Sequence, residues 1–227
     1  MNLEKYQQYS RIARGVEKAD LVLKEARIVN VFTEEIIRGD IAIQDGIIAG
    51  IGSFHGKEER DLAGRYVCPG FIDSHLHLES TLVTPAELVT VASRHGTTTF
   101  IVDPHESANV SGLAGVDYIL DQTENVKANV YVMMPSCVPA TSIDDNGCTL
   151  TAEDMAPYLH NSRILGLGEV MDSISVVQGE KSMHDKLELF EGRIRDGHAP
   201  FLEEGDLQAY AMAGIATDHE CSFFDYA

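Results

Sequence analysis

The alternation of apolar and polar residues changes once along the chain, about a third of the way from its start. Residues 19–52 alternate in short runs, which predicts a series of β-strands. The triplets RGD (residues 38–40) and QDG (residues 44–46) stand where tight turns between these strands are expected. Residues 3–19 instead have the periodicity of an amphipathic helix. Residues 1–67 are therefore predicted to form a helix and a small β-rich domain.

From residue 68 onward, apolar strand-like runs alternate with helical stretches. The six expected strands lie in the sequences CPGFIDSHLHLE, TTTFIVDPHE, ANVYVMMPSC, RILGLGEV, RIRDGHAP and IATDHE. Strands that alternate with helices predict a parallel sheet, so the fold class is α/β. We expect residues 68–227 to form a partial (β/α)₈ TIM-like barrel of about six strand units, because a closed barrel has eight.

Charged residues and histidines recur at the carboxyl end of these predicted strands. They are Asp73, His75, His77, Glu79, Asp103, His105, Glu106, Glu169, Asp196, His198, Asp218, His219 and Glu220. In a (β/α)₈ barrel this end of the strands carries the active site. The placement therefore predicts that these side chains meet at one site.

The type and spacing of these residues favour a metal centre. His75 and His77 are two residues apart on a strand, so both face the same side and can bind one cation as neutral imidazoles. Glu169 follows the small-residue run LGLG and could bridge two cations, with His198 and His219 completing the second. Histidine and carboxylate ligands suit manganese, iron or zinc. Two cations that share a water would produce hydroxide for the hydrolysis of an amide, a cyclic amide or an amino-heterocycle.

Each of these residues also has a plainer interpretation. An isolated His-x-His pair is often exposed or involved in capping, and Glu169 alone could be a carboxylate that stabilises a nearby helix N-terminus. The coincidence of suitable ligands at several equivalent strand ends favours the metal site.

The composition limits which partners the protein could bind and where in the cell it is expected. The chain has 17 Lys and Arg against 36 Asp and Glu, a net charge of −19, which disfavours nucleic-acid binding but leaves a free nucleobase open as a substrate. No apolar run is long enough to span a membrane. Cys68, Cys137, Cys148 and Cys221 form no CxxC pair and fit free thiols, so we expect a cytoplasmic protein.

Several of these motifs resemble a known family. PGFIDSHLHLES resembles the PGxIDxHxH motif of the amidohydrolase superfamily. GTTTFIVDPHESANV, MMPSCVPAT, LGLGEVM, DGHAP and AGIATDHE, in that order, resemble the bacterial adenine deaminase family from about Ala19 to Glu220. The resemblance implies a (β/α)₈ barrel with a small β domain, and hydrolysis of adenine to hypoxanthine and ammonia at two divalent cations, with manganese the first choice. A homo-oligomer is also possible.

The same resemblance implies roles for individual residues. The implied metal ligands are His75 and His77 for the first cation, His198 and His219 for the second, and Glu169 as the bridge in place of a carboxylated lysine. Asp103, His105, Asp218 and Glu220 are candidates for orienting the substrate or relaying protons, with a purely structural role equally open for each. The HxE…PCxxC signature of zinc nucleobase deaminases does not occur.

The chain departs from the family in its length, because family members are more than twice as long. The aspartate of the eighth strand, which takes the proton from the bridging hydroxide in the superfamily, has no counterpart, so the catalytic base is unassigned. We therefore expect a fragment, a truncated product or one part of a split protein, with little or no activity by itself. The alternatives are an inactive remnant and a cyclic amidohydrolase of the dihydroorotase or hydantoinase kind, against which the missing carboxylated-lysine position argues.

Overall fold

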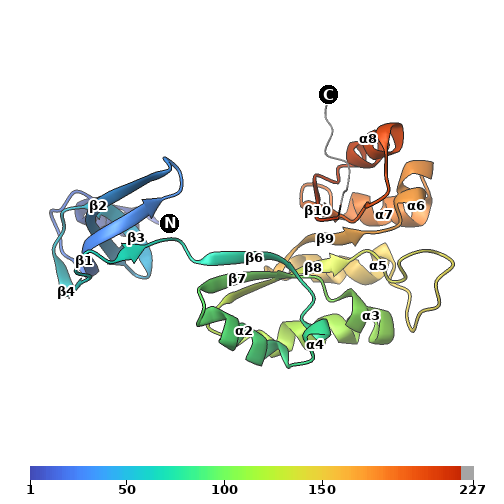
Figure 1. The fold of residues 1–227 in the computed structure, drawn as a ribbon, viewed down its shortest axis with the longest axis horizontal. Coiled ribbons are helices and arrows are strands. Elements are labelled where there is room, and N and C mark those ends of the chain that lie inside the picture. Colours follow the sequence, from blue (N-terminus) through green and yellow to red (C-terminus); the bar gives the residue numbers. More distant parts are fainter. Residues whose placement is uncertain (221–227) are drawn as a thin grey trace. The chain divides into compact units, whose positions relative to one another are not determined.

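The computed structural model spans the 227 residues and describes residues 1–220, so Cys221 lies outside the described part. The chain divides into two compact units, Met1–Pro69 and Gly70–Ala227, which are described separately (Figure 1). In the described residues, no helix is long and apolar enough to cross a membrane.

The first unit is one helix and a five-stranded sheet. Its elements are α1 (Leu3–Ala13), β1 (Ala19–Asn30), β2 (Glu35–Gln44), β3 (Ile47–Gly52), β4 (Gly56–Asp61) and β5 (Tyr66–Val67). Strands β1, β2 and β3 are antiparallel neighbours, whereas β4 and β5 both run parallel to β1. A small core forms where Ile12 of α1 packs with Val22, Ala42 and Phe54.

Only one of the two turns expected in this unit is present. The QDG triplet joins β2 to β3, and Asp45 and Gly46 both have positive φ, as the short turn of a hairpin requires. The prediction for the RGD triplet is wrong, because it lies inside β2. Asp40 is buried there and accepts a 2.5 Å hydrogen bond from Lys24 Nζ, so its polarity serves an internal ion pair.

The second unit is built on six parallel strands that pair in sequence order. They are β6 (Phe71–Leu76), β7 (Thr97–Val102), β8 (Asn129–Pro135), β9 (Ile164–Val170), β10 (Ile194–Gly197) and β11 (Thr217–Asp218). Every neighbouring pair is parallel, which confirms the predicted α/β class and the partial barrel. Within residues 1–220, β6 and β11 are the two edges of this sheet.

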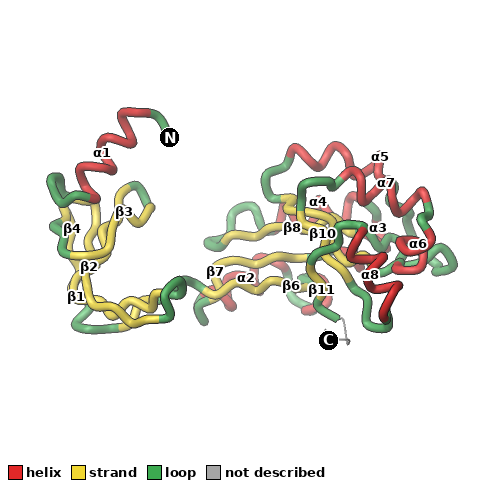
Figure 2. Tube along the Cα trace, turned by 90° about the horizontal axis from the view of Figure 1, so that it is seen from above, coloured by secondary structure: helices red, strands yellow, loops and turns green. Residues whose placement is uncertain are grey.

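Helices follow the strands of the second unit and cover the outside of the sheet. They are the 3-10 helix η1 (Glu79–Thr81), α2 (Pro85–Ser93), α3 (His105–Ser111), α4 (Leu113–Gln122), α5 (Ala152–Met155), the 3-10 helix η2 (Ala156–His160), α6 (Ser173–Gln178), α7 (Lys181–Leu189) and α8 (Glu204–Met212). Figure 2 shows α5, α6, α7 and α8 outside the strands of this unit.

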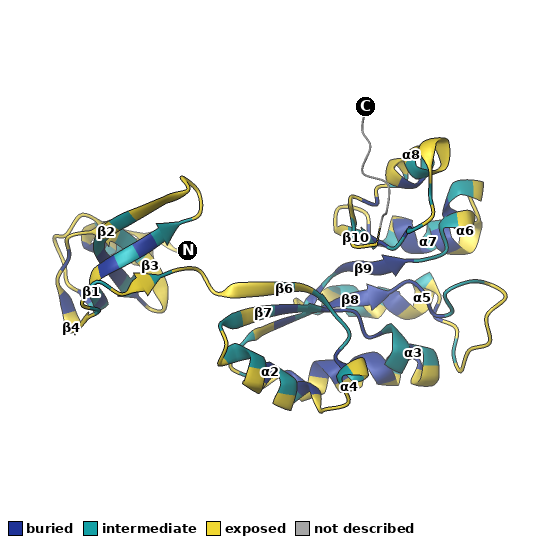
Figure 3. Ribbon diagram, viewed as in Figure 1, coloured by how far each residue is buried: buried dark blue, intermediate teal, exposed yellow. Residues whose placement is uncertain are grey.

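Burial is strongest in the middle of this sheet. Strands β8 and β9 are buried along most of their length, whereas the edge strand β6 is largely exposed (Figure 3). Phe100, Val132 and Leu167 from neighbouring strands belong to one apolar core under the helices. The carboxyl ends of the parallel strands therefore rest on a rigid base, and the candidate ligands lie at those ends.

Candidate metal site

The end of β6 carries the first two candidate ligands. His75 is the penultimate residue of this strand, and His77 comes directly after it. Their Nε2 atoms lie 3.0 Å apart. Both atoms also approach the same carboxylate oxygen, Glu169 Oε1, at 2.8 Å from His75 and 3.0 Å from His77. The two rings therefore face one point, as their spacing predicted.

Glu169 lies near the end of β9 and forms the centre of the site. Its side chain is almost completely buried, and its backbone has a left-handed φ of 32°. Gly168 precedes it, and a Cβ at that position would overlap the carboxylate of Asp103 and contact Met133. The small residues before Glu169 therefore let the Asp103 carboxylate approach the strand closely.

Strands β10 and β11 bring the remaining two expected ligands. His219 Nε2 lies 3.3 Å from Glu169 Oε1, and His198 Nδ1 lies 3.2 Å from His219 Nε2. The His75 and His219 rings stack at 3.7 Å between centroids, although they lie at opposite edges of the sheet. All five side chains expected to bind metal thus gather at one place.

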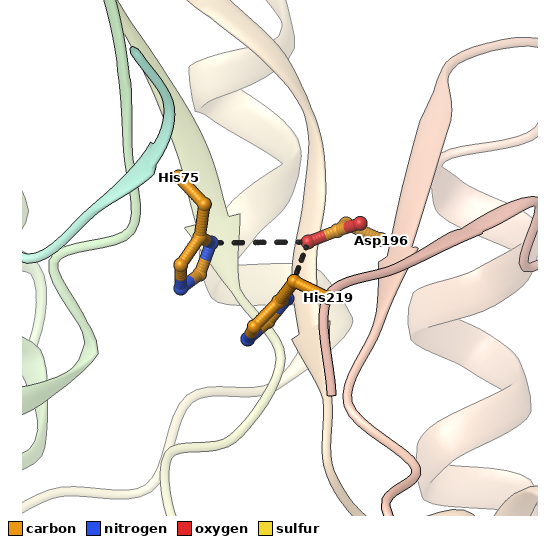
Figure 4. Close-up of side chains that lie close together, drawn as sticks. All are labelled: His75, Asp196 and His219. Atoms are coloured by element: carbon orange, nitrogen blue, oxygen red, sulfur yellow. Dashed lines mark hydrogen bonds and ion pairs between the residues drawn. The ribbon is translucent and has the colours of Figure 1, made fainter. Parts of the chain in front are cut away.

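The second nitrogen of three of these rings faces an acceptor. Asp196 Oδ2 lies 3.3 Å from His219 Nδ1 and 3.9 Å from His75 Nδ1 (Figure 4). His77 Nδ1 lies 2.8 Å from the carbonyl oxygen of Asp103. An acceptor beside Nδ1 favours the proton on that nitrogen and leaves the Nε2 lone pair available, which is the usual arrangement of metal-binding histidines.

The donor set fits divalent cations. Glu169 Oε2 and both carboxylate oxygens of Asp103 are buried and make no hydrogen bond of good geometry among residues 1–220, although His105 Nδ1 lies 3.0 Å from Glu169 Oε2. Buried carboxylate oxygens without partners are costly, and a cation would compensate them. Two groups of the expected ligands are also compact enough to hold one ion each: His75, His77 and Glu169, and Glu169, His198 and His219.

The close packing of imidazoles and carboxylates shifts the pKa values of several groups in the site. Burial opposes the ionisation of Glu169, but the rings of His105, His75 and His77 outweigh it and hold the Glu169 pKa far below its ordinary value. The hydrogen bond to Glu169 raises the pKa of His77 to about 9, against a smaller opposing effect of burial. Burial raises the pKa of the Asp103 carboxyl. Glu169 is therefore ionised, and the site attracts positive charge.

The four candidates for substrate or proton-relay roles divide into two pairs. His105, the first residue of α3, lies with its Nδ1 3.0 Å from Glu169 Oε2 and 3.6 Å from Asp103 Oδ1. Asp103 and His105 are thus in contact with the site. Asp218 lies in β11 and accepts a 2.8 Å hydrogen bond from the backbone of Glu220. Among residues 1–220, neither Asp218 nor Glu220 belongs to a group that could hold an ion.

The structure adds residues to which the sequence assigned no role. Asp196 was recognisable as polar at a strand end, but its place between two histidines depends on the curvature of the sheet. Cys137 is a buried thiol close to His105 and Glu169, and burial raises its pKa to about 11. No spacing rule pointed to this cysteine.

Glu79 corrects an expectation about the first strand. The sequence placed it with His75 and His77 at the carboxyl end of the first predicted strand, but it lies in η1, beyond the end of β6. Its Oε1 instead accepts weak hydrogen bonds from the backbone and hydroxyl of Ser107 in α3. The alternation still holds for His77, one residue past the end of β6, but not for Glu79, three residues past it.

Comparison with known proteins finds a matching family and several related sequences. A family model described as the amidohydrolase family matches residues 66–227. The adenine deaminase of Desulfitobacterium hafniense is 60% identical over 213 residues, which are 94% of this chain and 37% of that protein. The adenine deaminase of Clostridium acetobutylicum is 50% identical, with 92% and 37% covered. The chain thus spans little more than a third of the length of these relatives.

Two solved structures share the fold at low sequence identity. The N-acyl-D-glutamate deacylase of Bordetella bronchiseptica, a complex with zinc and a phosphonate inhibitor, has a TM-score of 0.56 at 17% identity, covering 88% of this chain and 51% of the other. The 5-methylcytosine deaminase of Klebsiella pneumoniae, bound to 5-fluorocytosine, has a TM-score of 0.53 at 15% identity, covering 85% and 55%.

Proposed function

The chain belongs to the amidohydrolase family, and from this premise we propose that its site binds two divalent cations for the hydrolytic deamination of adenine. One observation carries the proposal: four histidines and a buried glutamate from four different strand ends meet within hydrogen-bond distances of one another. The adenine deaminases among the relatives support the choice of substrate.

The ligand sets follow from the two compact groups. His75, His77 and Glu169 would hold one cation, and Glu169, His198 and His219 the other, so that Glu169 is shared. Mixed nitrogen and oxygen ligands suit manganese as first choice and iron or zinc as alternatives. A bound cation of this kind lowers the pKa of coordinated water and so supplies hydroxide at neutral pH.

The residues of the chain have separate tasks in this proposal. Asp196 and the Asp103 carbonyl orient the imidazole rings through their Nδ1 atoms. His105 lies between the Asp103 and Glu169 carboxylates, where it can hold or pass a proton during loss of ammonia. Adenine and water give hypoxanthine and ammonia, so the proton taken from water must reach the departing nitrogen. Asp218 and Glu220 remain weaker candidates for contact with the substrate.

The test is a metal count combined with a deamination assay. The protein would be stripped with a chelator, reloaded with Mn²⁺, and assayed for ammonia release from adenine and, in parallel, for dihydroorotate turnover. The variant His75→Ala/His77→Ala should lose bound metal. His55→Ala is the matched control, because this histidine is 82% exposed and lies in the first unit.

Four outcomes separate the alternatives. Metal-dependent release of ammonia from adenine, lost in the double variant, would support the proposal. Turnover of dihydroorotate alone would indicate a cyclic amidohydrolase instead. Full metal occupancy with no turnover of either compound would favour an inactive chain, and absence of metal binding would contradict the metal site itself. A cytoplasmic location and a homo-oligomer stay predictions from the sequence.

A further inference from the structure

The backbone of Glu169 has an uncommon conformation that its neighbours maintain. Its φ of 32° is in the left-handed region, which side chains other than glycine avoid. The carbonyl oxygen of Glu169 accepts two hydrogen bonds of 2.7 Å, one from the backbone of Met171 and one from Ser136 Oγ. Strained conformations persist where the surroundings over-determine them. The direction of the Glu169 side chain therefore depends on the groups that hold this carbonyl.

Ser136 connects three elements through all of its polar groups. It directly follows β8 and is completely buried. Its N–H donates to the carbonyl of Gly168 at 3.1 Å, and its hydroxyl donates to the carbonyl of Glu169. Its own carbonyl accepts a 2.7 Å hydrogen bond from Lys186 Nζ, fifty residues away on α7. Two consecutive carbonyls of β9 are thus tied to one residue, which α7 in turn holds.

Lys186 is an unexpected residue to find at this position. It is 7% exposed, and burial lowers its pKa. Its hydrogen bond to Ser136 is made to a neutral carbonyl, and within residues 1–220 its ammonium group makes no ion pair, although Asp172 and Asp154 partly favour its charged form from farther away. A buried ammonium is costly unless it is compensated, so a stable protein gains little by keeping one for packing alone.

We propose that Ser136 and Lys186 are positioning residues that fix the backbone of Glu169 and so direct its carboxylate toward His75, His77 and His219. This inference rests on the proposed metal site, for which Glu169 is the shared ligand. Ser136 donates to the backbone carbonyl of Glu169 and Lys186 donates to the carbonyl of Ser136, so both act through Glu169.

The surroundings of Lys186 allow a chemical-rescue experiment. Lys186 lines a cavity of about 520 Å³ together with Val138, Asp172 and Met183. Shortening the lysine to alanine would open a space next to the carbonyl of Ser136 that small alkylammonium ions could enter from this cavity. An added amine could then replace the missing hydrogen bond without any change to the metal ligands.

The experiment measures Mn²⁺ affinity by equilibrium dialysis on the 227-residue chain, with urea unfolding on the same samples. Ser136→Ala and Lys186→Met should each weaken Mn²⁺ binding about 10- to 100-fold, the loss typical of groups that orient metal ligands. The double variant Ser136→Ala/Lys186→Met should bind Mn²⁺ no more weakly than the single variant with the lower affinity, because Lys186 acts on Glu169 only through Ser136. Ethylammonium should restore part of the affinity of Lys186→Ala and have no effect on the wild type.

Two variants control for general loss of stability. Thr123→Val removes a buried hydroxyl just after the end of α4, away from the site; this hydroxyl donates to the Ile119 carbonyl at 2.7 Å and accepts from Arg163 at 3.0 Å. Lys181→Met removes an exposed lysine from the same helix as Lys186. Both variants should bind Mn²⁺ with an affinity within about twofold of the wild type, even if the urea concentration at the midpoint of unfolding changes.

The results distinguish this inference from the metal site on which it rests. If Ser136→Ala binds Mn²⁺ as tightly as the wild type, the positioning role is wrong but the metal site stands. The same holds if Thr123→Val, at the same stability as Ser136→Ala, loses as much Mn²⁺ affinity. A wild-type chain that binds no Mn²⁺ would reject the metal site and the inference together. If Lys186→Met does not fold, Ser136→Ala still decides, because it removes a single hydroxyl.

Discussion

Replacing Glu169 by glutamine would test the electrostatic argument for the site most directly. The substitution keeps the shape of the side chain and removes the charge that faces His75, His77, His105 and His219. In metal-free protein, the pKa of His77 is raised from 6.5 to about 9, and the hydrogen bond to Glu169 is the main cause. The whole rise corresponds to about 3.4 kcal/mol, at 1.36 kcal/mol for each pH unit.

The expected change is smaller than this total. The Asp103 carbonyl and Glu106 also raise the His77 pKa, so Glu169→Gln should lower it by about 1 to 2 pH units, or about 1.4 to 2.7 kcal/mol. The His77 pKa is higher in the folded than in the unfolded chain. Its contribution to folding is therefore complete below pH 6.5 and is lost as the pH rises to about 9.

The assay is an NMR titration of the histidine rings in chelator-treated protein, with urea unfolding at pH 6 and pH 9. The free energy of unfolding of the wild type should be lower at pH 9 than at pH 6. This decrease should be smaller in Glu169→Gln. Glu188→Gln, on the exposed side of α7, is the control and should titrate like the wild type. A His77 pKa that stays near 9 in Glu169→Gln would refute the assignment of its cause.

Three further substitutions have expected outcomes that follow from contacts in the second unit. Gly168→Ala should lower the free energy of unfolding by about 1–3 kcal/mol in urea, because its Cβ would overlap the Asp103 carboxylate; an unchanged midpoint would contradict this close approach. Asp196→Ala should weaken Mn²⁺ binding about 10- to 100-fold in equilibrium dialysis, since the carboxylate orients His75 and His219; wild-type affinity would show that the rings need no such partner. Leu167→Ala should cost about 2–5 kcal/mol in urea unfolding, because this side chain is completely buried in the core; a loss below 1 kcal/mol would mean that the core collapses around the gap.

The sequence predicted the parts of the molecule that depend on local pattern. The order and parallel direction of the six strands followed from strand–helix alternation, and the ligand types followed from their place at strand ends. The spacing of His75 and His77 placed both rings on one side of the strand, and suitable residues at other strand ends made a metal site the favoured interpretation. The family resemblance supplied the assignment of Glu169 as a shared ligand, and the structure places it at the centre of four imidazoles.

Features that depend on tertiary contacts could not be predicted. The RGD triplet has the composition of a turn, but the ion pair of Asp40 with Lys24 keeps it within a strand. Cys137 has no ligand-like spacing, and it reaches the site only because β8 ends beside Glu169. Ser136 and Lys186 are fifty residues apart and carry no common motif, so only the fold connects them.

The stacking of His75 on His219 has a consequence for the order in which the sheet opens. These rings lie at the ends of its first and last described strands, and both rings reach one carboxylate on the interior strand β9. Edge strands normally exchange their amide protons before interior ones, and the exposed β6 would ordinarily do so independently of β11. A bound cation would join the two edges through Glu169, so their exchange protection should rise and fall together. The two edges of the sheet would then open together, as one cooperative unit, when the metal is bound.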